Sequence, residues 1–229
     1  MPLSSQEYQL IDHFSQYVSD HKKELIDQIL EYRTRQVTVV LEDIYQSQNA
    51  SAVVRTCECM GIQDIHIIEN MNSYEVNRDV LRGAHKWENL IHYKSKKENN
   101  TGVCFETLRK NGYTIYATDP AIENASIDEV DISQSKVALV FGNELHGLSE
   151  FALKNADQKV KIPMYGFTES LNISVSVAVC LTKLTSKLDR NRKQYGLTQD
   201  EKDELKLNWY RTVVNRSEII EKEFLRTIR

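Results

Sequence analysis

Residues 136–149 read KVALVFGNELHGLS, and this stretch decides the fold class. Residues 137–141 form a continuous apolar run, which is typical of a strand buried on both faces of a parallel sheet. Gly142 ends the run, and Gly147 follows within a short polar segment. A strand that leads into such a turn brings backbone N–H groups close to a ligand, so we expect a binding loop here. The two glycines could also simply shape a tight turn.

The same segment nearly matches the phosphate-binding pattern G-x-x-x-x-G-K-[ST]. Leu148 stands where that pattern needs the lysine that neutralises nucleotide phosphates, which disfavours an NTPase. The chain has eight glycines and no G-x-G-x-x-G, so the usual dinucleotide-binding fingerprint is absent.

Outward from this stretch, short β-branched runs alternate with amphipathic segments. We expect a strand at 136–142 and further strands at 37–42, 64–69, 113–118 and 159–164, with helices at 49–60, 101–111 and 149–156. Residues 72–88 are polar and irregular, with a short helix near Val80. Strands alternating with helices predict an α/β domain with a mainly parallel sheet.

One segment does not yield to periodicity. ISVSVAVC (173–180) alternates strictly between apolar and small residues, which favours a strand. The segment continues into Leu181, Leu184 and Leu188, whose spacing is helical. Periodicity leaves both interpretations open.

Helical segments flank this domain on both sides. The apolar residues of 5–34 recur at helical spacing: Leu10, Phe14, Val18, Leu25 and Ile29. Residues 198–229 are polar and helical, with Trp209, Tyr210, Val213, Ile219 and Phe224 as packing points. We therefore divide the chain into a helical N-terminal extension (1–35), a central domain (36–192) and a helical C-terminal extension (193–229).

The composition restricts the class of protein. No apolar run approaches the roughly 20 residues that span a bilayer, and no signal sequence is recognisable, so we expect a cytoplasmic protein. The four cysteines and six histidines show no metal-binding spacing, and we expect no metal. The net charge of −4 argues mildly against nucleic acid, but basic residues cluster locally, at Lys183, Lys187, Arg190, Arg192 and Lys193. Such a run is also typical of a solvated helix face.

Two further polar groups follow expected strands. Asn49 and Arg55 come after strand 37–42, close to two helical turns apart, so we expect them near one face at the ligand-binding edge of the sheet. Asn49 could instead cap a helix, and Arg55 could be a surface residue. Ser170 and Asn172 follow strand 159–164, where Ser170 is a good helix cap.

Taken together, three segments resemble the motifs of the SpoU/TrmH family within the SPOUT methyltransferase superfamily. They are Asn49-Ala-Ser-Ala-Val-Val-Arg55-Thr56, then Val140-Phe-Gly142-Asn143-Glu144-Leu-His-Gly147-Leu148, then Ile162-Pro-Met164 with Ser170-Leu171-Asn172-Ile-Ser174. Each motif alone is weak, but the three in this order are specific. The resemblance covers about residues 36–192 and is closer to the tRNA-acting branch than to the rRNA-acting branch.

The resemblance implies a fold and a cofactor. The fold would have helices on both faces of the sheet and a C-terminal trefoil knot, with a helix over 170–190, and the protein would be a homodimer. S-adenosyl-L-methionine would bind in the knot near the subunit interface, between Thr118, Gly142, Ile162 and Leu171. Ile162 and Leu171 would flank the adenine, although ordinary core packing also explains both residues.

The implied reaction is methylation of a ribose 2′-hydroxyl in RNA, most simply a guanosine in the tRNA D-loop. Arg55 would be the key residue. Deprotonating free arginine, with a pKa of about 13, costs roughly 8 kcal/mol at pH 7. We therefore expect Arg55 to bind phosphate and stabilise the developing oxyanion.

The resemblance also implies supporting roles for other residues. Asn49 would orient Arg55 or the ribose, Glu144 would hold Arg55 or the nucleotide, and Ser170 and Asn172 would order the cofactor loop and an RNA phosphate. The basic stretch 183–193 and the terminal helices would follow the RNA backbone. Ribosomal RNA as the substrate, or a catalytically silent RNA-binding module, are the alternatives.

Overall fold

The computed structural model describes residues 2–74, 77–123, 125–188 and 192–228. The chain divides into two compact units, Thr34–Tyr195 and a helical unit that combines Met1–Arg33 with Gly196–Arg229. The segments that precede and follow the central domain thus form one unit. None of the described helices is long and apolar enough to cross a membrane.

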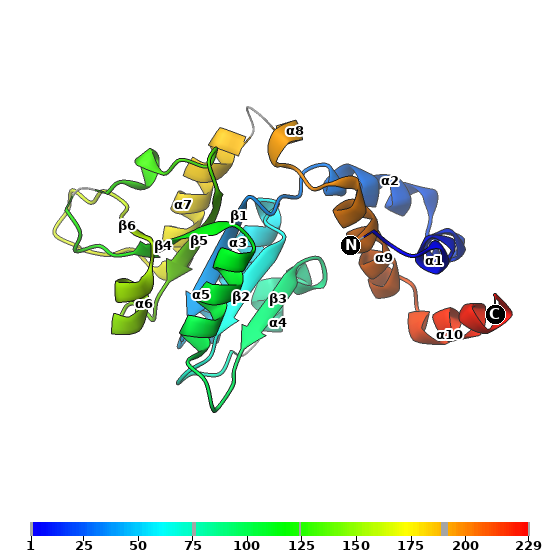
Figure 1. Ribbon diagram of the computed structural model, residues 1–229, viewed down its shortest axis with the longest axis horizontal. Coiled ribbons are helices and arrows are strands. Elements are labelled where there is room, and N and C mark those ends of the chain that lie inside the picture. Colours follow the sequence, from blue (N-terminus) through cyan, green and yellow to red (C-terminus); the bar gives the residue numbers. More distant parts are fainter. Residues whose placement is uncertain (1, 75–76, 124, 189–191, 229) are drawn as a thin grey trace. The chain divides into compact units, whose positions relative to one another are not determined.

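The larger unit is built on a six-stranded sheet (Figure 1). Its strands are β1 (Val37–Glu42), β2 (Asp64–Ile68), β3 (Asn89–Tyr93), β4 (Tyr113–Thr118), β5 (Lys136–Phe141) and β6 (Gln158–Val160). Their order is β3-β2-β1-β5-β4-β6, and all five neighbouring pairs are parallel. The predicted mainly parallel sheet is confirmed. Strand β5, which comes from the apolar run at 137–141, lies near its centre.

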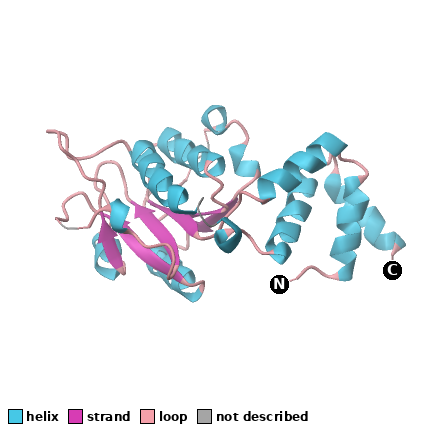
Figure 2. Cartoon of the chain, turned by 90° about the horizontal axis from the view of Figure 1, so that it is seen from above, coloured by secondary structure: helices cyan, strands magenta, loops and turns pink. Residues whose placement is uncertain are grey.

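Helices cover both faces of the sheet (Figure 2). On one face, alternate residues of β1 pack against α3 (Ser47–Cys59) and α7 (Ile173–Leu188). On the other face, Val40 and Val140 pack against α5 (Asn100–Lys110) and α6 (Glu150–Asn155). The short helices α4 (Arg78–Leu81), η1 (Ala84–Lys86), η2 (Ile127–Glu129) and α8 (Arg192–Tyr195) complete this unit. Both faces of the parallel sheet are therefore buried, which explains the continuous apolar run of β5.

Segment 173–188 is helical, as the family resemblance implied against the alternation. Its buried residues follow helical spacing, with Ile173, Val177, Cys180, Leu181 and Leu184 facing the core. The helix begins three residues later than expected. The side chain of Asn172 accepts hydrogen bonds from the backbone N–H of Ser174 at 2.9 Å and from its hydroxyl at 2.6 Å. Asn172 therefore caps α7, which corrects the assignment of this cap to Ser170.

Two strands differ from the expectation. Strand β3 was not predicted, because its sequence NLIHY lies at the sheet edge, mostly half-buried, and lacks both an apolar run and clear alternation. Strand β6 ends at Val160, so Ile162 and Met164 lie in the loop beyond the strand. That loop carries the third motif.

The helical unit consists of α1 (Ser5–Ser15), α2 (Asp20–Leu30), α9 (Gln199–Val213) and α10 (Ser217–Thr227). Reciprocal capping boxes start two of them, from Ser4 and Glu7 in α1 and from Thr198 and Glu201 in α9. Within this unit α1 and α2 pack on α9, and α10 packs on α1 and α9.

Candidate active site

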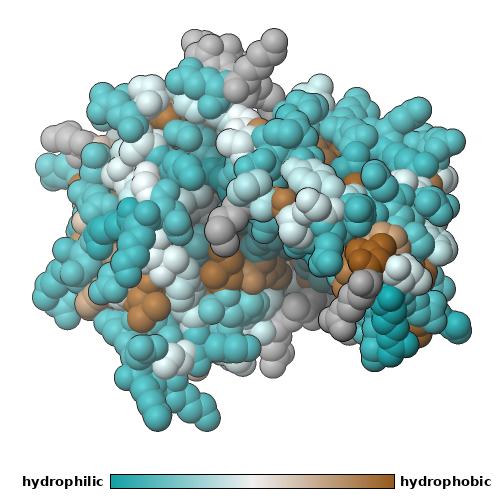
Figure 3. Space-filling model, turned by 45° about the vertical axis from the view of Figure 1, so that its right-hand side comes forward, coloured by the Kyte–Doolittle hydropathy of each residue, from teal (hydrophilic) through white to brown (hydrophobic). Residues whose placement is uncertain are grey.

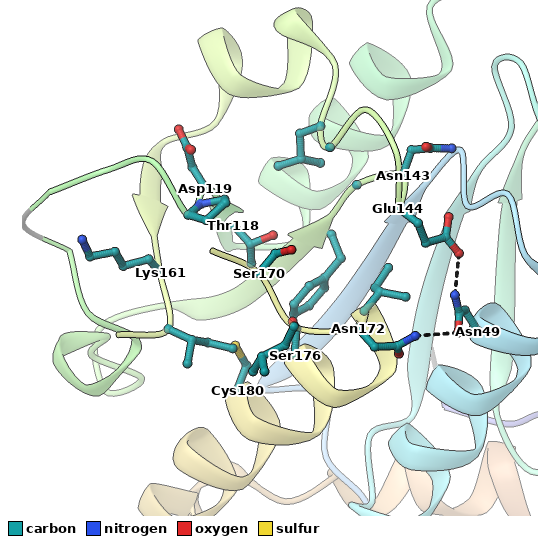
Figure 4. Close-up of a pocket in the computed structure, with 18 of the residues that line it drawn as sticks. Asn49, Thr118, Asp119, Asn143, Glu144, Lys161, Ser170, Asn172, Ser176 and Cys180 are labelled. Atoms are coloured by element: carbon teal, nitrogen blue, oxygen red, sulfur yellow. Dashed lines mark hydrogen bonds between the residues drawn. The ribbon is translucent and has the colours of Figure 1, made fainter. Parts of the chain in front are cut away.

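A cavity of about 620 Å³ opens at the carboxyl ends of β4, β5 and β6 and beside the start of α7 (Figure 4). Open parallel sheets bind ligands at this edge, and the volume is typical of a small-molecule site. All four residues expected to hold a cofactor line it: Thr118, Gly142, Ile162 and Leu171. Four of the five expected catalytic residues also line it: Asn49, Glu144, Ser170 and Asn172. The three motifs therefore converge on one cavity.

The loop after β5 is held rigidly by its own backbone. The N–H of Asn143 donates to the carbonyl of Gly147 at 2.9 Å, and the N–H of Gly147 donates back at 2.8 Å. The Asn143 side chain accepts from the backbone N–H groups of Leu145 and His146. A Cβ on Gly142 would lie 2.3 Å from backbone atoms of Gly147 and Leu148. The sequence pattern therefore encodes a backbone approach that only glycine permits.

Glu144 projects from this loop towards α3 and accepts three hydrogen bonds. Two come from backbone N–H groups, of Tyr45 at 3.0 Å and of Gln46 at 3.3 Å. The third comes from Nδ2 of Asn49 at 2.9 Å. Burial acts to raise the pKa of Glu144, but these hydrogen bonds outweigh it and hold the pKa below its ordinary value. The carboxylate is therefore ionised at neutral pH.

Asn49 lies in the first turn of α3 and joins all three motifs. Its Nδ2 donates to Glu144 of the second motif, and its Oδ1 accepts from Nδ2 of Asn172 at 3.1 Å. Figure 4 shows these two bonds as dashed lines. The cap of α3 is Gln46, so the alternative interpretation of Asn49 as the helix cap is wrong. Its side chain is directed to the cavity wall instead.

Two acids at the end of β1, which the sequence analysis missed, brace the site. The buried Glu42 accepts hydrogen bonds from the Ser149 hydroxyl at 2.8 Å and the Thr101 hydroxyl at 2.6 Å. Asp43 adopts a left-handed backbone with a φ of 53°, and its carbonyl accepts from Nδ2 of Asn143 at 2.7 Å. The available signal was the pair of consecutive acids directly after an apolar strand, since buried acids need such partners.

The structure adds detail to the cofactor residues. The hydroxyl of Thr118 donates to the carbonyl of Val140 at 2.8 Å, so this side chain holds β4 against β5. Ile162 is half-buried, and Leu171 is 39% exposed towards solvent, unlike an ordinary core residue. Ser170 is exposed and lines the cavity.

Arg55 does not lie at the cavity. It is exposed on α3, and the residues that line the cavity include Asn49 and exclude Arg55. Six residues turn an α-helix by roughly 600°, which leaves the two side chains about 120° apart around the axis. The expectation of one shared face was therefore wrong.

The basic stretch is partly engaged within the protein. Lys183 forms an ion pair with Asp128 at 2.7 Å, and both side chains are about half exposed. Lys187 donates to the carbonyls of Asp128 at 2.8 Å and Val130 at 2.7 Å. Arg190 lies outside the described residues, and so do the side chains of Arg192 and Lys193. Within the described residues no group of three or more His, Cys, Asp or Glu side chains could hold a metal ion.

Comparison with known proteins gives consistent matches. Residues 36–182 match the SpoU rRNA Methylase family. A tRNA (guanosine(18)-2′-O)-methyltransferase of Borreliella burgdorferi is 43% identical, over 90% of this chain and 92% of the relative. The crystal structure of the Aquifex aeolicus TrmH/SpoU tRNA modifying enzyme matches with a TM-score of 0.73 and 26% identity, over 85% of this chain and 98% of that one.

A third match shares the fold. The SpoU methyltransferase AviRb from Streptomyces viridochromogenes, solved in complex with AdoMet, has a TM-score of 0.56 and 19% identity. The match covers 68% of this chain and 58% of that one.

Proposed function

The chain belongs to the SpoU rRNA methylase family, and on that premise we propose that it methylates the ribose 2′-hydroxyl of a guanosine in tRNA, in the D-loop, using S-adenosyl-L-methionine. One observation carries the choice of substrate. A relative named as a tRNA (guanosine(18)-2′-O)-methyltransferase is 43% identical over 90% of the chain, a length that includes residues beyond the family domain.

The cavity fits the cofactor. Its volume suits a ligand of this size, and the tight loop after Gly142 presents backbone groups without an intervening Cβ. Ile162 and Leu171 would supply the apolar walls for the adenine. When bound, the cofactor supplies an electrophilic methyl group on a sulfonium. The protein residues then have to position the ribose oxygen and manage its proton.

The residues of the cavity are suited to positioning. Asn49 is fixed from both sides, by Glu144 and by Asn172, so its placement needs no rearrangement when a substrate enters. The ionised Glu144 holds the start of α3 through the N–H groups of Tyr45 and Gln46. We propose that Ser170 and Asn172 order the cofactor loop and contact an RNA phosphate.

We assign Arg55 the binding of a substrate phosphate and the stabilisation of the developing 2′-oxyanion. Its exposure on α3 makes it accessible to RNA. Arg55 lies outside the cavity of its own chain. It can therefore act there only if bound RNA reaches from the cavity to Arg55, or if it serves the cavity of a second chain. This placement supports a homodimer with the cofactor cavity near the subunit interface.

Two exposed apolar residues at the same edge also support the homodimer. Leu145 in the loop after β5 is 76% exposed, and Val175 in the first turn of α7 is 46% exposed. We further propose that the segment through α7 forms the trefoil knot, on the strength of family membership. Lys183, the basic residues 190–193 and the helical unit would follow the RNA backbone. With tRNA as substrate, the protein would act in the cytoplasm.

The test is direct. The purified protein is incubated with unmodified bulk tRNA and methyl-labelled S-adenosyl-L-methionine, and the RNA is digested to nucleosides. We expect labelled 2′-O-methylguanosine, and Arg55→Ala should abolish most of it. Label on ribosomal RNA alone would keep the chemistry and overturn the tRNA assignment. Label on neither RNA, with intact cofactor binding, would indicate a silent RNA-binding module.

A further inference from the structure

A second hollow of about 420 Å³ adjoins the candidate active site. It shares Lys161, Ile162 and Met164 with the cofactor cavity, and residues of the following loop form another part of its wall, at Gly166, Thr168 and Glu169. In Figure 4 Lys161 lies across the cavity from Asn49 and Glu144. The hollow therefore extends the site on the side away from the hydrogen-bonded asparagines.

Two oppositely charged side chains, of Lys161 and Glu169, border this hollow. Within the described part of the chain, the side chains of Lys161 and Glu169 form neither hydrogen bonds nor ion pairs. Other charged side chains near the cavity are engaged, since Asp119 pairs with Lys159 and Glu144 accepts three hydrogen bonds. The Lys161 ammonium can donate hydrogen bonds and the Glu169 carboxylate can accept them, so the hollow suits a ligand that carries both an acceptor and a donor along one edge.

Aromatic side chains flank the same loop. Tyr165 is 95% exposed and Phe167 is 108% exposed, on either side of Gly166. Most of the surface seen in Figure 3 is hydrophilic, so two fully exposed rings beside a binding cavity call for an occupant. Unstacked RNA bases pack on such rings, and each ring face accepts any base.

We propose that this hollow receives the base of the target nucleotide and reads it as guanine, an inference that rests on the proposed function. Guanine offers N–H donors at N1 and N2 and acceptors at O6 and N7. The Glu169 carboxylate accepts from N1 and N2, and the Lys161 ammonium donates to O6 or N7. Ile162 and Met164 contact the ring, while Tyr165 and Phe167 stack on the base or its neighbour.

The decisive experiment changes one group on the base. Full-length tRNA is prepared with guanosine or with inosine, which lacks the 2-amino group, at the methylated position. The wild-type protein should prefer guanosine by about 5- to 150-fold in kcat/KM. Glu169→Ala should lower kcat/KM for the guanosine tRNA more than for the inosine tRNA, which keeps N1–H but lacks the N2 donor, so the preference for guanosine approaches one. A merely structural loss would lower both equally and overturn the assignment.

Controls separate this inference from the proposed function. Glu106→Gln removes an exposed acid on α5, outside both hollows, and should keep the full preference for guanosine. Cofactor affinity, measured by calorimetry, should be the same in wild type and Glu169→Ala. A fall in cofactor affinity as large as the fall in kcat/KM for the guanosine tRNA would assign the hollow to the cofactor and overturn the inference. If the wild type methylates guanosine and inosine tRNA equally, the function stands and the inference fails; if it methylates no tRNA, both fail.

The stacking surface has its own test. Phe167→Trp places an indole where a stacked base quenches its fluorescence. We expect quenching when tRNA is added and none with the cofactor alone. Light scattering of Phe167→Ala should show the oligomeric state of the wild type. A change in that state without loss of tRNA affinity would show that a second copy of the chain covers the ring, which contradicts stacking.

Discussion

Asn172 donates a hydrogen bond from Nδ2 to Oδ1 of Asn49 at 3.1 Å, which ties the cap of α7 to the first turn of α3. Nδ2 of Asn49 in turn donates a hydrogen bond to the Glu144 carboxylate at 2.9 Å. An amide can accept on one side and donate on the other, so Asn49 is suited to a place between an amide donor and a carboxylate acceptor. Three segments that are far apart in sequence thereby hold one another in register.

Replacing Asn49 should uncouple the three segments. In Asn49→Ala both bonds are lost, and we expect kcat to fall about 100-fold because the site loses its fixed geometry. The free energy of unfolding should fall by roughly 1 kcal/mol, the usual net value of such bonds. Asn49→Asp should be more damaging, since a second carboxylate would face Glu144. Single-turnover methyl transfer and denaturant titration measure both effects.

The matched control for this prediction is Gln48→Ala. Gln48 is the exposed neighbour of Asn49 in α3 and lies outside the cavity. It should behave as the wild type. An Asn49→Asp protein as active as the wild type would show that the link to Glu144 has no role in positioning.

Glu144 predicts a specific dependence of stability on pH. Its pKa is lowered in the folded protein, by the hydrogen bonds from Asn49, Tyr45 and Gln46 against the opposing effect of burial. The stability that it contributes is fully present above its unfolded pKa of about 4.3. That stability is lost as the pH falls through the folded pKa. The difference in unfolding free energy between wild type and Glu144→Gln should be constant from pH 6 to 8 and shrink below about pH 4.3.

Urea titrations at several pH values measure this difference. A difference that instead grew with acidity would mean that the folded pKa is raised, contrary to the hydrogen-bond pattern. The activity should show no inflection from Glu144 between pH 6 and 9, since the carboxylate stays ionised there.

The sequence predicted most of the sheet, because strand periodicity is a local property. The three family motifs predicted most of the residues that were expected in the site and that line the cavity. The sequence was insufficient where the outcome depends on neighbours. The second helix shows this, since Ile26 and Leu30 are buried where Leu25 and Ile29 were expected. The chain breaks between α1 and α2, so the helical phase of α1 does not continue into α2.

The sequence also did not predict which apolar side chains are exposed or which residues are hydrogen-bonded across the fold. Ile219 was expected to pack and is 55% exposed on α10. Asp43 and Asn143 are bonded across 100 positions of sequence, which no periodicity can indicate. For segment 173–188 the alternation was misleading, because small residues at 174, 176 and 178 suit a helix equally well. Only the family motifs resolved that choice.

Gly142→Ala should damage the site more than its size suggests. The new Cβ would lie 2.3 Å from backbone atoms of Gly147 and Leu148, so the loop that carries Glu144 has to move. We expect a loss of about 1 to 3 kcal/mol in stability, together with loss of cofactor binding by calorimetry. Gly102→Ala in α5 is the control, because its Cβ would lie 3.4 Å from the Phe151 ring of α6, an ordinary van der Waals distance. Wild-type cofactor affinity in Gly142→Ala would contradict the close approach.

Lys187 and Lys183 should differ although they are one turn apart. Lys187→Met leaves two carbonyls of the segment 128–130 without their donor, and we expect a loss of about 1 to 3 kcal/mol in stability. Lys183→Met removes a half-exposed ion pair and should cost at most about 1 kcal/mol. Lys183→Met should instead reduce the salt dependence of tRNA affinity, by a slope of about 1 if it meets a phosphate. Equal stability losses for both variants would show that Lys187 is no anchor of this segment.

The last prediction concerns how Arg55 acts. Arg55→Lys keeps a positive charge but loses the planar fork that binds phosphate at two points, so kcat/KM for tRNA should fall at neutral pH. Cofactor affinity should stay at the wild-type value, because Arg55 does not line the cavity. If Arg55 stabilises charge, the activity of the Lys variant should be flat with pH until the lysine itself titrates near pH 10.4. If Arg55 were the base that removes the 2′-proton, the more acidic lysine would give activity that rises about tenfold per pH unit in this range. A flat profile at reduced activity therefore supports stabilisation, and full activity with an unchanged profile would remove any special role of the guanidinium.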